Sequence, residues 1–117
     1  MYEYAGVVTN VVDGDTLDIV VDLGFDIHTK KRVRLLDIDT PEIFGPNSRE
    51  EFDRGVEARE FVKKAVLGKK VTLVTHKDKT GKYGRYLADI VFTREAFGEA
   101  LFLVEELKKA GFDTNTT

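Results

Sequence analysis

The chain has 117 residues, of which 42% are hydrophobic and 33% are charged, so it is long enough for one folded domain and too apolar to be disordered. It contains no cysteine, which excludes disulfides, thiolate catalysis and cysteine zinc sites and leaves oxygen groups, His28 and His76 as candidate metal ligands. The formal net charge of −3 weighs against a nucleic-acid partner, because lysine and arginine drive phosphate binding.

The first part of the chain is expected to form three strands. Aliphatic and β-branched residues recur there in partial alternation, which is typical of strands with one buried face. The strands are predicted at 5–8 leading to 11–12, at 16–21 and at 32–36. Asp13-Gly14 predicts a tight turn after the first, and residues 22–29, with Gly24, predict a longer hairpin loop after the second. Pro41 is expected to end strand pairing.

Residues 56–67 predict an amphipathic helix. Its apolar positions fall on one helical face, and Gly68 is placed to end it. Those positions are Ala58, Phe61, Val62, Ala65 and Val66. Two starts are open: Ser48 with Glu51 has the pattern of a capping box, whereas Gly55 favours a later start near Asp53.

Two further strands are predicted at 70–75 and 86–92, joined through the polar turn 77–82. Thr93 is expected to cap a last helix that runs to about Ala110 and is ended by Gly111. Three strands, a helix, two strands and a helix predict an α+β, mainly β class: a five-stranded OB-fold Greek-key barrel with an inserted helix and a C-terminal helix. The domain is expected to span 1–112, with 113–117 as a frayed tail.

Positive charge is clustered although the chain is acidic overall. Basic residues gather at 30–34 and again at 77–85, whereas acidic residues gather at 50–60 and at 95–106. The distribution of charge matters more for phosphate binding than the total. The chain can therefore present a basic face to nucleic acid.

Two acidic runs follow the predicted strand ends. The run 13–16 places two carboxylates across a glycine turn, and the run 37–42 supplies three more where the third strand breaks. Calcium and magnesium prefer such oxygen ligands, although each run alone is also typical of a solvated turn or loop. If the runs meet, two bare carboxylates about 4 Å apart repel by about 4 kcal/mol at an effective dielectric constant of about 20. A converging set would therefore need a cation.

Two arginines flank these runs. Arg34 lies in the third strand just before the second run, and Arg85 lies just before the fifth strand. The planar guanidinium binds two phosphate oxygens and stays charged, as a phosphoryl transition state requires, whereas a surface salt bridge is the alternative for a single strand arginine. Arg34 and Asp39 would point to opposite faces of a flat strand. The chain must bend between them if both serve one site.

Together these motifs resemble the staphylococcal nuclease (thermonuclease, micrococcal nuclease) family. The matching segments are Asp13-Gly14-Asp15-Thr16, then Arg34-Leu35-Leu36-Asp37-Ile38-Asp39-Thr40-Pro41-Glu42, then Asp78 with Lys82-Tyr83-Gly84-Arg85. They occur in the family's order and at similar separations, and the resemblance covers about residues 7–111, including the helix from 55 to 64. It implies a calcium-dependent nuclease that hydrolyses DNA or RNA and leaves 3′-phosphate ends.

The resemblance also implies how one calcium ion would be held. Asp15 and Asp39 match the family's carboxylate ligands, and the backbone carbonyl of Thr40 matches a third ligand. Asp13 matches a nearby acid that does not touch the ion directly.

The remaining residues of the family's site are matched as well. Glu42 corresponds to the proposed general base that activates or orients the attacking water. Arg34 and Arg85 correspond to the two arginines that bind the phosphate. Lys82 and Tyr83 correspond to residues beside the bound nucleotide, where an amine meets phosphate and an aromatic ring stacks or donates a hydrogen bond.

Two residues depart from the family's pattern. Asp37 is an extra acid, which we expect to face solvent. Phe44 lies in a loop whose composition differs from the family's; it either stacks on a base or packs into the core, and the core interpretation is favoured.

The competing hypothesis is an OB-fold module without catalytic activity that binds single-stranded nucleic acid or a protein partner. Such a module would have little need of Glu42. We expect a DNA or RNA partner, no membrane, no evident protein partner, and a monomer or weak oligomer. The location would be cytoplasmic if Met1 is the natural start, and extracellular if the chain is trimmed from a longer precursor.

Overall fold

The strands close into a barrel in the computed structural model, which describes residues 2–80, 86–95 and 98–114. The barrel strands are β1 (Tyr2–Asp13), β2 (Thr16–Asp22), β3 (His28–Leu35), β4 (Lys70–Thr80) and β5 (Tyr86–Phe92). Neighbours pair antiparallel in the order β3-β2-β1-β4-β5, and a parallel pairing of β3 with β5 closes the ring. A short strand, β6 (Leu101–Phe102), pairs with β5. The predicted five-stranded OB-fold barrel is confirmed.

The barrel interior follows from alternation along each strand. In β2, Leu17, Ile19 and Val21 are buried, while Asp18 and Val20 between them are partly exposed. The same alternation in β3 buries Val33 and Leu35. These inward side chains form one continuous core, to which both helices contribute.

The inserted helix, α1 (Arg49–Val66), begins at the earlier of the two predicted positions. Ser48 is its N-cap, and the Ser48 hydroxyl accepts a hydrogen bond from the Glu51 backbone N–H at 3.0 Å. The predicted end is confirmed, since Leu67 is the C-cap and Gly68 has a φ of +75°. The alternative start near Asp53 is wrong, and Gly55 lies buried inside the helix.

The last helix is shorter than the sequence predicted. The helix α2 spans Leu103–Lys109, its N-cap is Phe102, and Thr93 therefore does not cap it. The chain before α2 is held instead by pairing of β5 with β6, which places Val91 opposite Phe102. The predicted end is confirmed, because Gly111 follows the helix with a φ of +84°.

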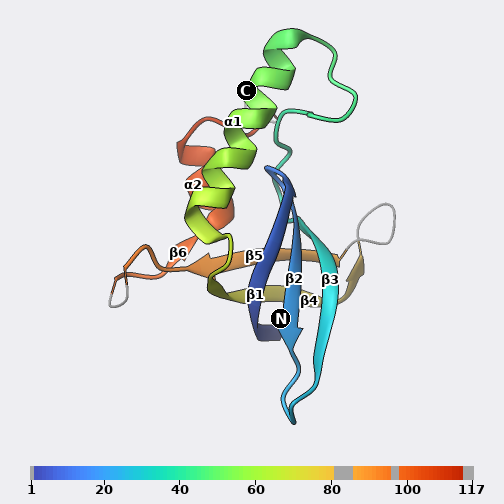
Figure 1. The fold of residues 1–117 in the computed structure, drawn as a ribbon, viewed down its shortest axis with the longest axis vertical. Coiled ribbons are helices and arrows are strands. Elements are labelled where there is room, and N and C mark those ends of the chain that lie inside the picture. The colour runs from blue at the N-terminus through green and yellow to red at the C-terminus, as the bar shows by residue number, and fades with distance from the viewer. Residues whose placement is uncertain (1, 81–85, 96–97, 115–117) are drawn as a thin grey trace.

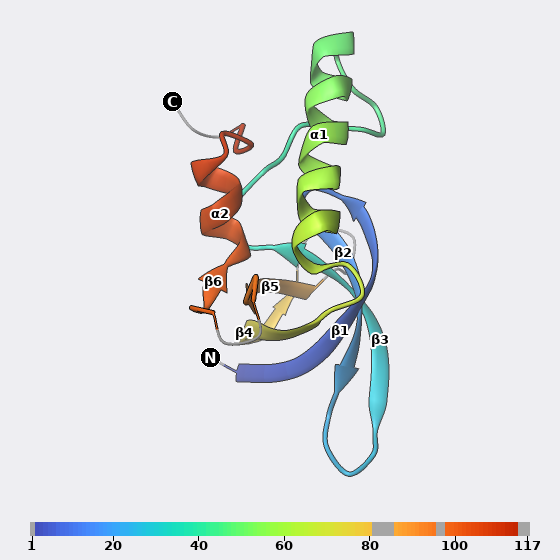
Figure 2. The same cartoon turned by 60° about the vertical axis from the view of Figure 1, so that its left-hand side comes forward.

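The helices lie together at one end of the barrel. Figures 1 and 2 show α1 and α2 at the same end of the barrel, while the β2–β3 hairpin and the N-terminal end of β1 lie at the opposite end. The helix end of the barrel is closed by the buried face of α1, which includes Ala58 and Val62. Within the part of the chain that the structure describes, no helix is long and apolar enough to cross a membrane.

Candidate active site

The turn between β1 and β2 presents the first acidic run. The Asp13 carboxylate accepts a hydrogen bond from the Asp15 backbone N–H at 3.1 Å, and Asp13 pairs with Thr16 across the turn. A Cβ at Gly14 would lie 2.8 Å from both the Ala58 Cβ and the Thr40 Oγ1. Glycine is needed here because the turn packs directly against α1 and the second acidic run.

Asp15 joins the two acidic runs. The residue is only 8% exposed, and its Oδ2 accepts a hydrogen bond from the Thr40 backbone N–H at 3.0 Å. Its Oδ1 accepts one from the Thr16 hydroxyl at 3.1 Å. The turn and the segment after β3 therefore meet through a buried, charge-assisted hydrogen bond.

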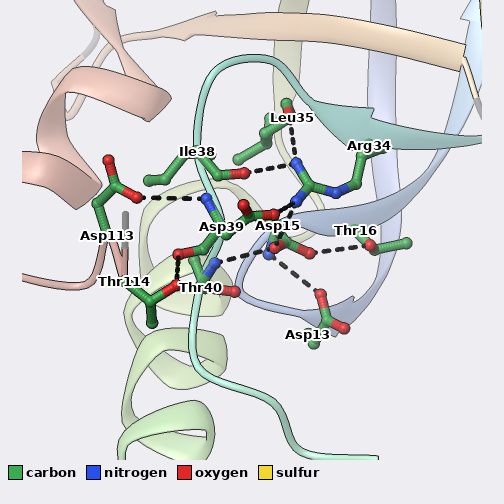
Figure 3. A network of polar contacts seen from close by, with 10 residues as sticks. All are labelled: Asp13, Asp15, Thr16, Arg34, Leu35, Ile38, Asp39, Thr40, Asp113 and Thr114. Atoms are coloured by element: carbon green, nitrogen blue, oxygen red, sulfur yellow. Dashed lines mark hydrogen bonds and ion pairs between the residues drawn. The ribbon is translucent and has the colours of Figure 1, made fainter. Parts of the chain in front are cut away.

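Arg34 lies where the carboxylates converge, as Figure 3 shows. Its side chain is 16% exposed, and Nη2 lies 3.3 Å from the Asp15 Oδ2 and forms an ion pair with the Asp39 Oδ1. Its Nη1 donates to the backbone carbonyls of Leu35 and Ile38. The guanidinium is thus held by four acceptors, and its charge offsets the repulsion between the two carboxylates.

The bend that Arg34 and Asp39 require lies at Asp37. The Leu36 N–H still donates to the Ala88 carbonyl of β5 at 3.0 Å, and the next residue, Asp37, has a φ of +59°. Aspartate is one of the few residues other than glycine that tolerate this left-handed conformation. Asp37 is exposed, as expected, and its backbone turns Asp39 back towards Arg34.

Negative charge is in excess at the β1–β2 turn. Burial, together with the hydrogen bond to the Asp15 side chain and repulsion by the Asp15 carboxylate, raises the pKa of the Asp13 carboxyl to about 7. Arg34 contacts Asp15 and Asp39 directly. The turn therefore has an electrostatic preference for additional positive charge.

The C-terminal segment holds Asp39 from the side opposite Arg34. Thr114 donates two hydrogen bonds to the Asp39 carbonyl, from its backbone N–H at 2.8 Å and its hydroxyl at 3.0 Å. The Asp113 carboxylate accepts from the Asp39 N–H at 3.4 Å. These contacts join residues more than seventy positions apart in the sequence, and no local pattern indicated them.

Glu42 lies three residues beyond Asp39 in the same segment. It is exposed between the buried Pro41 and Ile43, so its carboxylate is accessible from solvent. A Cβ at Gly55 would lie 2.8 Å from the Pro41 carbonyl oxygen and 3.0 Å from that of Glu42. A glycine is needed at position 55 because the helix backbone touches the segment that carries Glu42. The residues next to Gly55 in the sequence do not indicate this contact.

Phe44 is 66% exposed, so the favoured core interpretation is wrong. Ile43, which is 7% exposed, takes the buried position beside α1. The chain then runs over the surface to Ser48. The phenyl ring of Phe44, which follows Glu42 by two positions, is exposed to solvent.

The donor groups at this site fit a hard cation. Asp15 and Asp39 provide carboxylate oxygens, and the Thr40 hydroxyl is buried without a hydrogen-bond partner among the described residues. Hard cations take such oxygens and complete their coordination with water or phosphate. The described residues hold no cluster of three or more histidine and carboxylate side chains arranged for a metal, so a cation here would depend on these two carboxylates.

Three residues of the third motif, Lys82, Tyr83 and Arg85, lie outside the described residues. What the structure brings together is Asp13, Asp15, Arg34, Asp39 and Thr40, with Glu42 in the same loop.

The amino-acid sequence is similar to those of several known proteins. The chain is 36% identical to a thermonuclease of Staphylococcus hyicus and 38% identical to one of Staphylococcus intermedius, in each case over 90% of this chain and 58% of the relative. It is 32% identical to an uncharacterised protein of Methanocaldococcus jannaschii, over 93% of this chain and 58% of the relative. The chain thus spans a little over half the length of these relatives. The family model for staphylococcal nuclease homologues matches residues 32–112, and the chain therefore belongs to the staphylococcal nuclease homologue family.

Proposed function

We propose that the chain is a calcium-dependent nuclease that hydrolyses phosphodiester bonds of DNA or RNA. The observation that carries the proposal is the convergence of Asp15, Asp39 and Arg34 on one point, with the exposed Glu42 in the same loop. A phosphodiester needs positive charge on its oxygens and a base for the attacking water. The similarity to thermonucleases supports the same activity.

Arg34 is positioned to bind the scissile phosphate. Its Nη1 stays on the carbonyls of Leu35 and Ile38, which keeps the guanidinium in one plane. A phosphate oxygen competes with Asp15 and Asp39 only for Nη2. Because the fork is already oriented, it stabilises charge that develops on the phosphate without further ordering. We assign Arg85 the same role from its match to the third motif.

Glu42 is proposed to act as the general base. It accepts a proton from the attacking water as a new oxygen–phosphorus bond forms and the bond from phosphorus to the 5′-oxygen breaks. The 5′-oxygen takes up a proton, and the upstream strand keeps a 3′-phosphate. Pro41 and Ile43, both buried, fix the backbone on either side of Glu42, which supports a fixed position for this carboxylate.

One calcium ion is proposed to bind at Asp15, Asp39 and the Thr40 carbonyl, with Asp13 nearby. When bound, it supplies Lewis-acid stabilisation of the phosphate and neutralises the carboxylates. Lys82 and Tyr83 are proposed to contact the bound nucleotide, by charge and by stacking respectively.

Digestion of single-stranded DNA and of RNA with calcium, with magnesium and with a chelator tests this function. We expect calcium-dependent cleavage that falls about 10²- to 10⁴-fold in Glu42→Gln, with strand binding retained, because only the base is lost. Arg85→Ala should lose both cleavage and phosphate affinity. Glu60→Gln, an exposed carboxylate of α1, is the matched control and should cleave normally. A folded protein that binds strands and cleaves none under any of these conditions would instead be a binding module.

A further inference from the structure

The barrel is open at the end opposite α1. A pocket of about 480 Å³ lies there, lined by residues from all five barrel strands, and we call it the mouth pocket. Its floor is formed by the buried side chains Val21, Val33 and Leu73. The volume falls within the roughly 300–1,000 Å³ of typical ligand sites, which are often found in the mouths of barrels.

Aromatic rings form much of the wall of the mouth pocket. Tyr2, Tyr4 and Tyr86 line it from β1 and β5, and Tyr2 and Tyr86 are 44% and 43% exposed. Exposed tyrosine rings at the entrance of an apolar cavity suit a planar ligand with polar edges. Any nucleobase can stack on such a ring, because every base has a π-face.

A positive charge faces the same cavity. Lys31 alternates with Val33 and Leu35, whose side chains are buried in the barrel, so it points to the inner side of β3. Its Nζ lies 5.4 Å from the centre of the Tyr86 ring, and its cross-strand partner is Ile19. Among the residues that the structure describes, no carboxylate lies within salt-bridge distance of this amine. The charge on Lys31 is therefore available to an anion.

The pairing of β3 with β5 connects the mouth pocket to the strand segment that carries Arg34. Val33 of the floor pairs with Tyr86 of the wall, and the next pair is Arg34 with Leu87. Arg34 directly follows Val33, and Arg85 directly precedes Tyr86. Val33 and Tyr86 of the pocket are thus each one residue along the chain from an arginine to which we assign the scissile phosphate, and Arg34 lies on the opposite face of β3 from Val33.

We propose that the mouth pocket binds one nucleotide of the substrate strand, with its base stacked among the tyrosines and a phosphate at Lys31. The charge at Lys31 favours an anionic planar ligand over an apolar one, and Arg34 follows Val33 of the pocket floor on the opposite face of the same strand. The choice of nucleic acid rests on the proposed nuclease function. The pocket would then add affinity for a strand at a point away from the bond that is cut.

Tyrosine fluorescence, compared between the unmodified protein and matched variants, tests the pocket. The chain has four tyrosines and no tryptophan, and Tyr2, Tyr4 and Tyr86 line the pocket. With a chelator present, we expect thymidine 5′-monophosphate to quench this emission and to bind more tightly than thymidine. Lys31→Met should weaken monophosphate binding about tenfold and leave thymidine binding unchanged, since only the phosphate contact is lost. Lys30→Met removes the same charge from the outer side of β3 and should leave both unchanged.

Cleavage kinetics provide the second measurement. Tyr86→Leu should raise KM for a long strand about tenfold, while kcat for a dinucleotide, which is too short to fill both sites, stays the same. The proposal is overturned if Lys31→Met and Tyr86→Leu bind nucleotide as the unmodified protein does. It is also overturned if these substitutions change only the sedimentation coefficient, because the mouth pocket would then be an interface between copies of the chain.

The failure of this proposal and that of the nuclease function are distinguishable. An unmodified protein that binds thymidine 5′-monophosphate through Lys31 and cleaves nothing would support the pocket and contradict the nuclease. A protein that cleaves strands normally, and whose pocket variants behave as the unmodified protein does, would support the nuclease and contradict the pocket.

Discussion

The Arg34 guanidinium has two functions that a lysine cannot combine. It donates to the carbonyls of Leu35 and Ile38 and at the same time contacts Asp15 and Asp39. An ammonium group is a compact charge without a planar fork, so it can satisfy one side of this arrangement at most.

We therefore expect Arg34→Lys to lower kcat about 10²- to 10³-fold and to cost about 1–3 kcal/mol of unfolding free energy, because buried acceptors lose their donors. Single-turnover cleavage and urea denaturation measure the two effects. Arg32→Lys is the control on the same face of β3, where the arginine is exposed and bonded to Asp18, and it should change stability by less than about 1 kcal/mol. Normal cleavage by Arg34→Lys would contradict the phosphate-binding role.

At the scale of single residues, the sequence left the placement of several side chains open. Alternation required a bend between Arg34 and Asp39, but only the backbone shows that Asp37 takes the left-handed conformation that provides it. Phe44 was misplaced because burial of a loop aromatic depends on what the neighbouring residue occupies, and Ile43 fills the available site. Such competition between neighbours is a tertiary effect that composition does not encode.

The contact between α1 and the Glu42 segment belongs to the scale of elements. Replacing an exposed helical glycine with alanine usually stabilises a helix by about 1 kcal/mol. At Gly55 the new Cβ would meet the backbone oxygens of Pro41 and Glu42, and backbone cannot rotate away as a flexible side chain can. The steric cost, about 1–3 kcal/mol, should exceed the gain in helix propensity.

Gly55→Ala is therefore expected to destabilise the protein and to reduce cleavage, because the Glu42 segment must shift away from α1. The urea midpoint and the cleavage rate report the two effects. Lys64→Ala, an exposed substitution in the same helix, should stay within about 0.5 kcal/mol of the unmodified protein. A Gly55→Ala protein that is more stable and fully active would mean that the packing of α1 is looser than described.

The start of α2 depends on a side chain from the barrel. Its N-cap, Phe102, supplies no side-chain hydrogen bond, but the Asp89 carboxylate of β5 accepts from the Val104 N–H at 3.3 Å and from the Ile90 N–H at 2.7 Å. Burial raises the pKa of the Asp89 carboxyl, against the lowering effect of these two donors. The folded protein thus binds this proton more tightly than the unfolded chain.

The sign of the pH dependence follows. The contribution of Asp89 to stability is fully present below its unfolded pKa of about 3.9 and is lost as pH rises through the raised folded pKa. Asp89→Asn keeps an oxygen acceptor without a charge, so its stability relative to the unmodified protein should increase from about pH 3 to about pH 7. Asp89→Ala loses the cap and should cost about 1 kcal/mol. Urea midpoints at both pH values check this, and a pH-independent difference for Asp89→Asn would contradict it.

The prediction that Thr93 caps the last helix failed for a related reason. The local pattern of threonine followed by acidic and apolar residues favours a helix, whereas pairing with β5 holds Leu101 and Phe102 in a strand, so the helix begins only at Leu103. Tertiary pairing overrides local propensity in such cases. The Ser48 cap was predictable because its partner, Glu51, is three residues away.

For the whole molecule, the acidic runs predict a link between calcium and stability. A cation at Asp15 and Asp39 would bind the folded protein and not the unfolded chain, so calcium at about 100 times its Kd should add about 2.7 kcal/mol. For a domain of this size, this corresponds to a rise in Tm of about 10 °C. Differential scanning calorimetry with and without calcium measures it.

Asp39→Asn should remove most of this calcium-dependent rise, while Glu60→Gln should retain it. Sodium at equal ionic strength controls for general screening. A Tm of the unmodified protein that calcium leaves unchanged would contradict the assignment of Asp15 and Asp39, whatever the cleavage assays show.

The order of the elements and the barrel class were predictable because they depend on patterns of a few residues repeated along the chain. The meeting of the two acidic runs was inferred from the resemblance, and the hydrogen bond from Thr40 to Asp15 shows how it is made. The contacts of Asp113 and Thr114 with Asp39 were not predictable, since nothing in a short segment indicates a partner more than seventy positions away.

Those C-terminal contacts make the site depend on a sub-global opening of the molecule. Thr114 follows α2 and is hydrogen-bonded to the Asp39 carbonyl. Phe112, between α2 and Thr114, packs against α1: the centre of its ring lies 4.4 Å from the Arg54 Cζ. An opening that releases α2 and leaves the barrel folded frees the Asp39 carbonyl, and its free energy cannot exceed that of global unfolding. Warming should then abolish cleavage before the barrel melts, and amide hydrogens of α2 should exchange faster than those of β2.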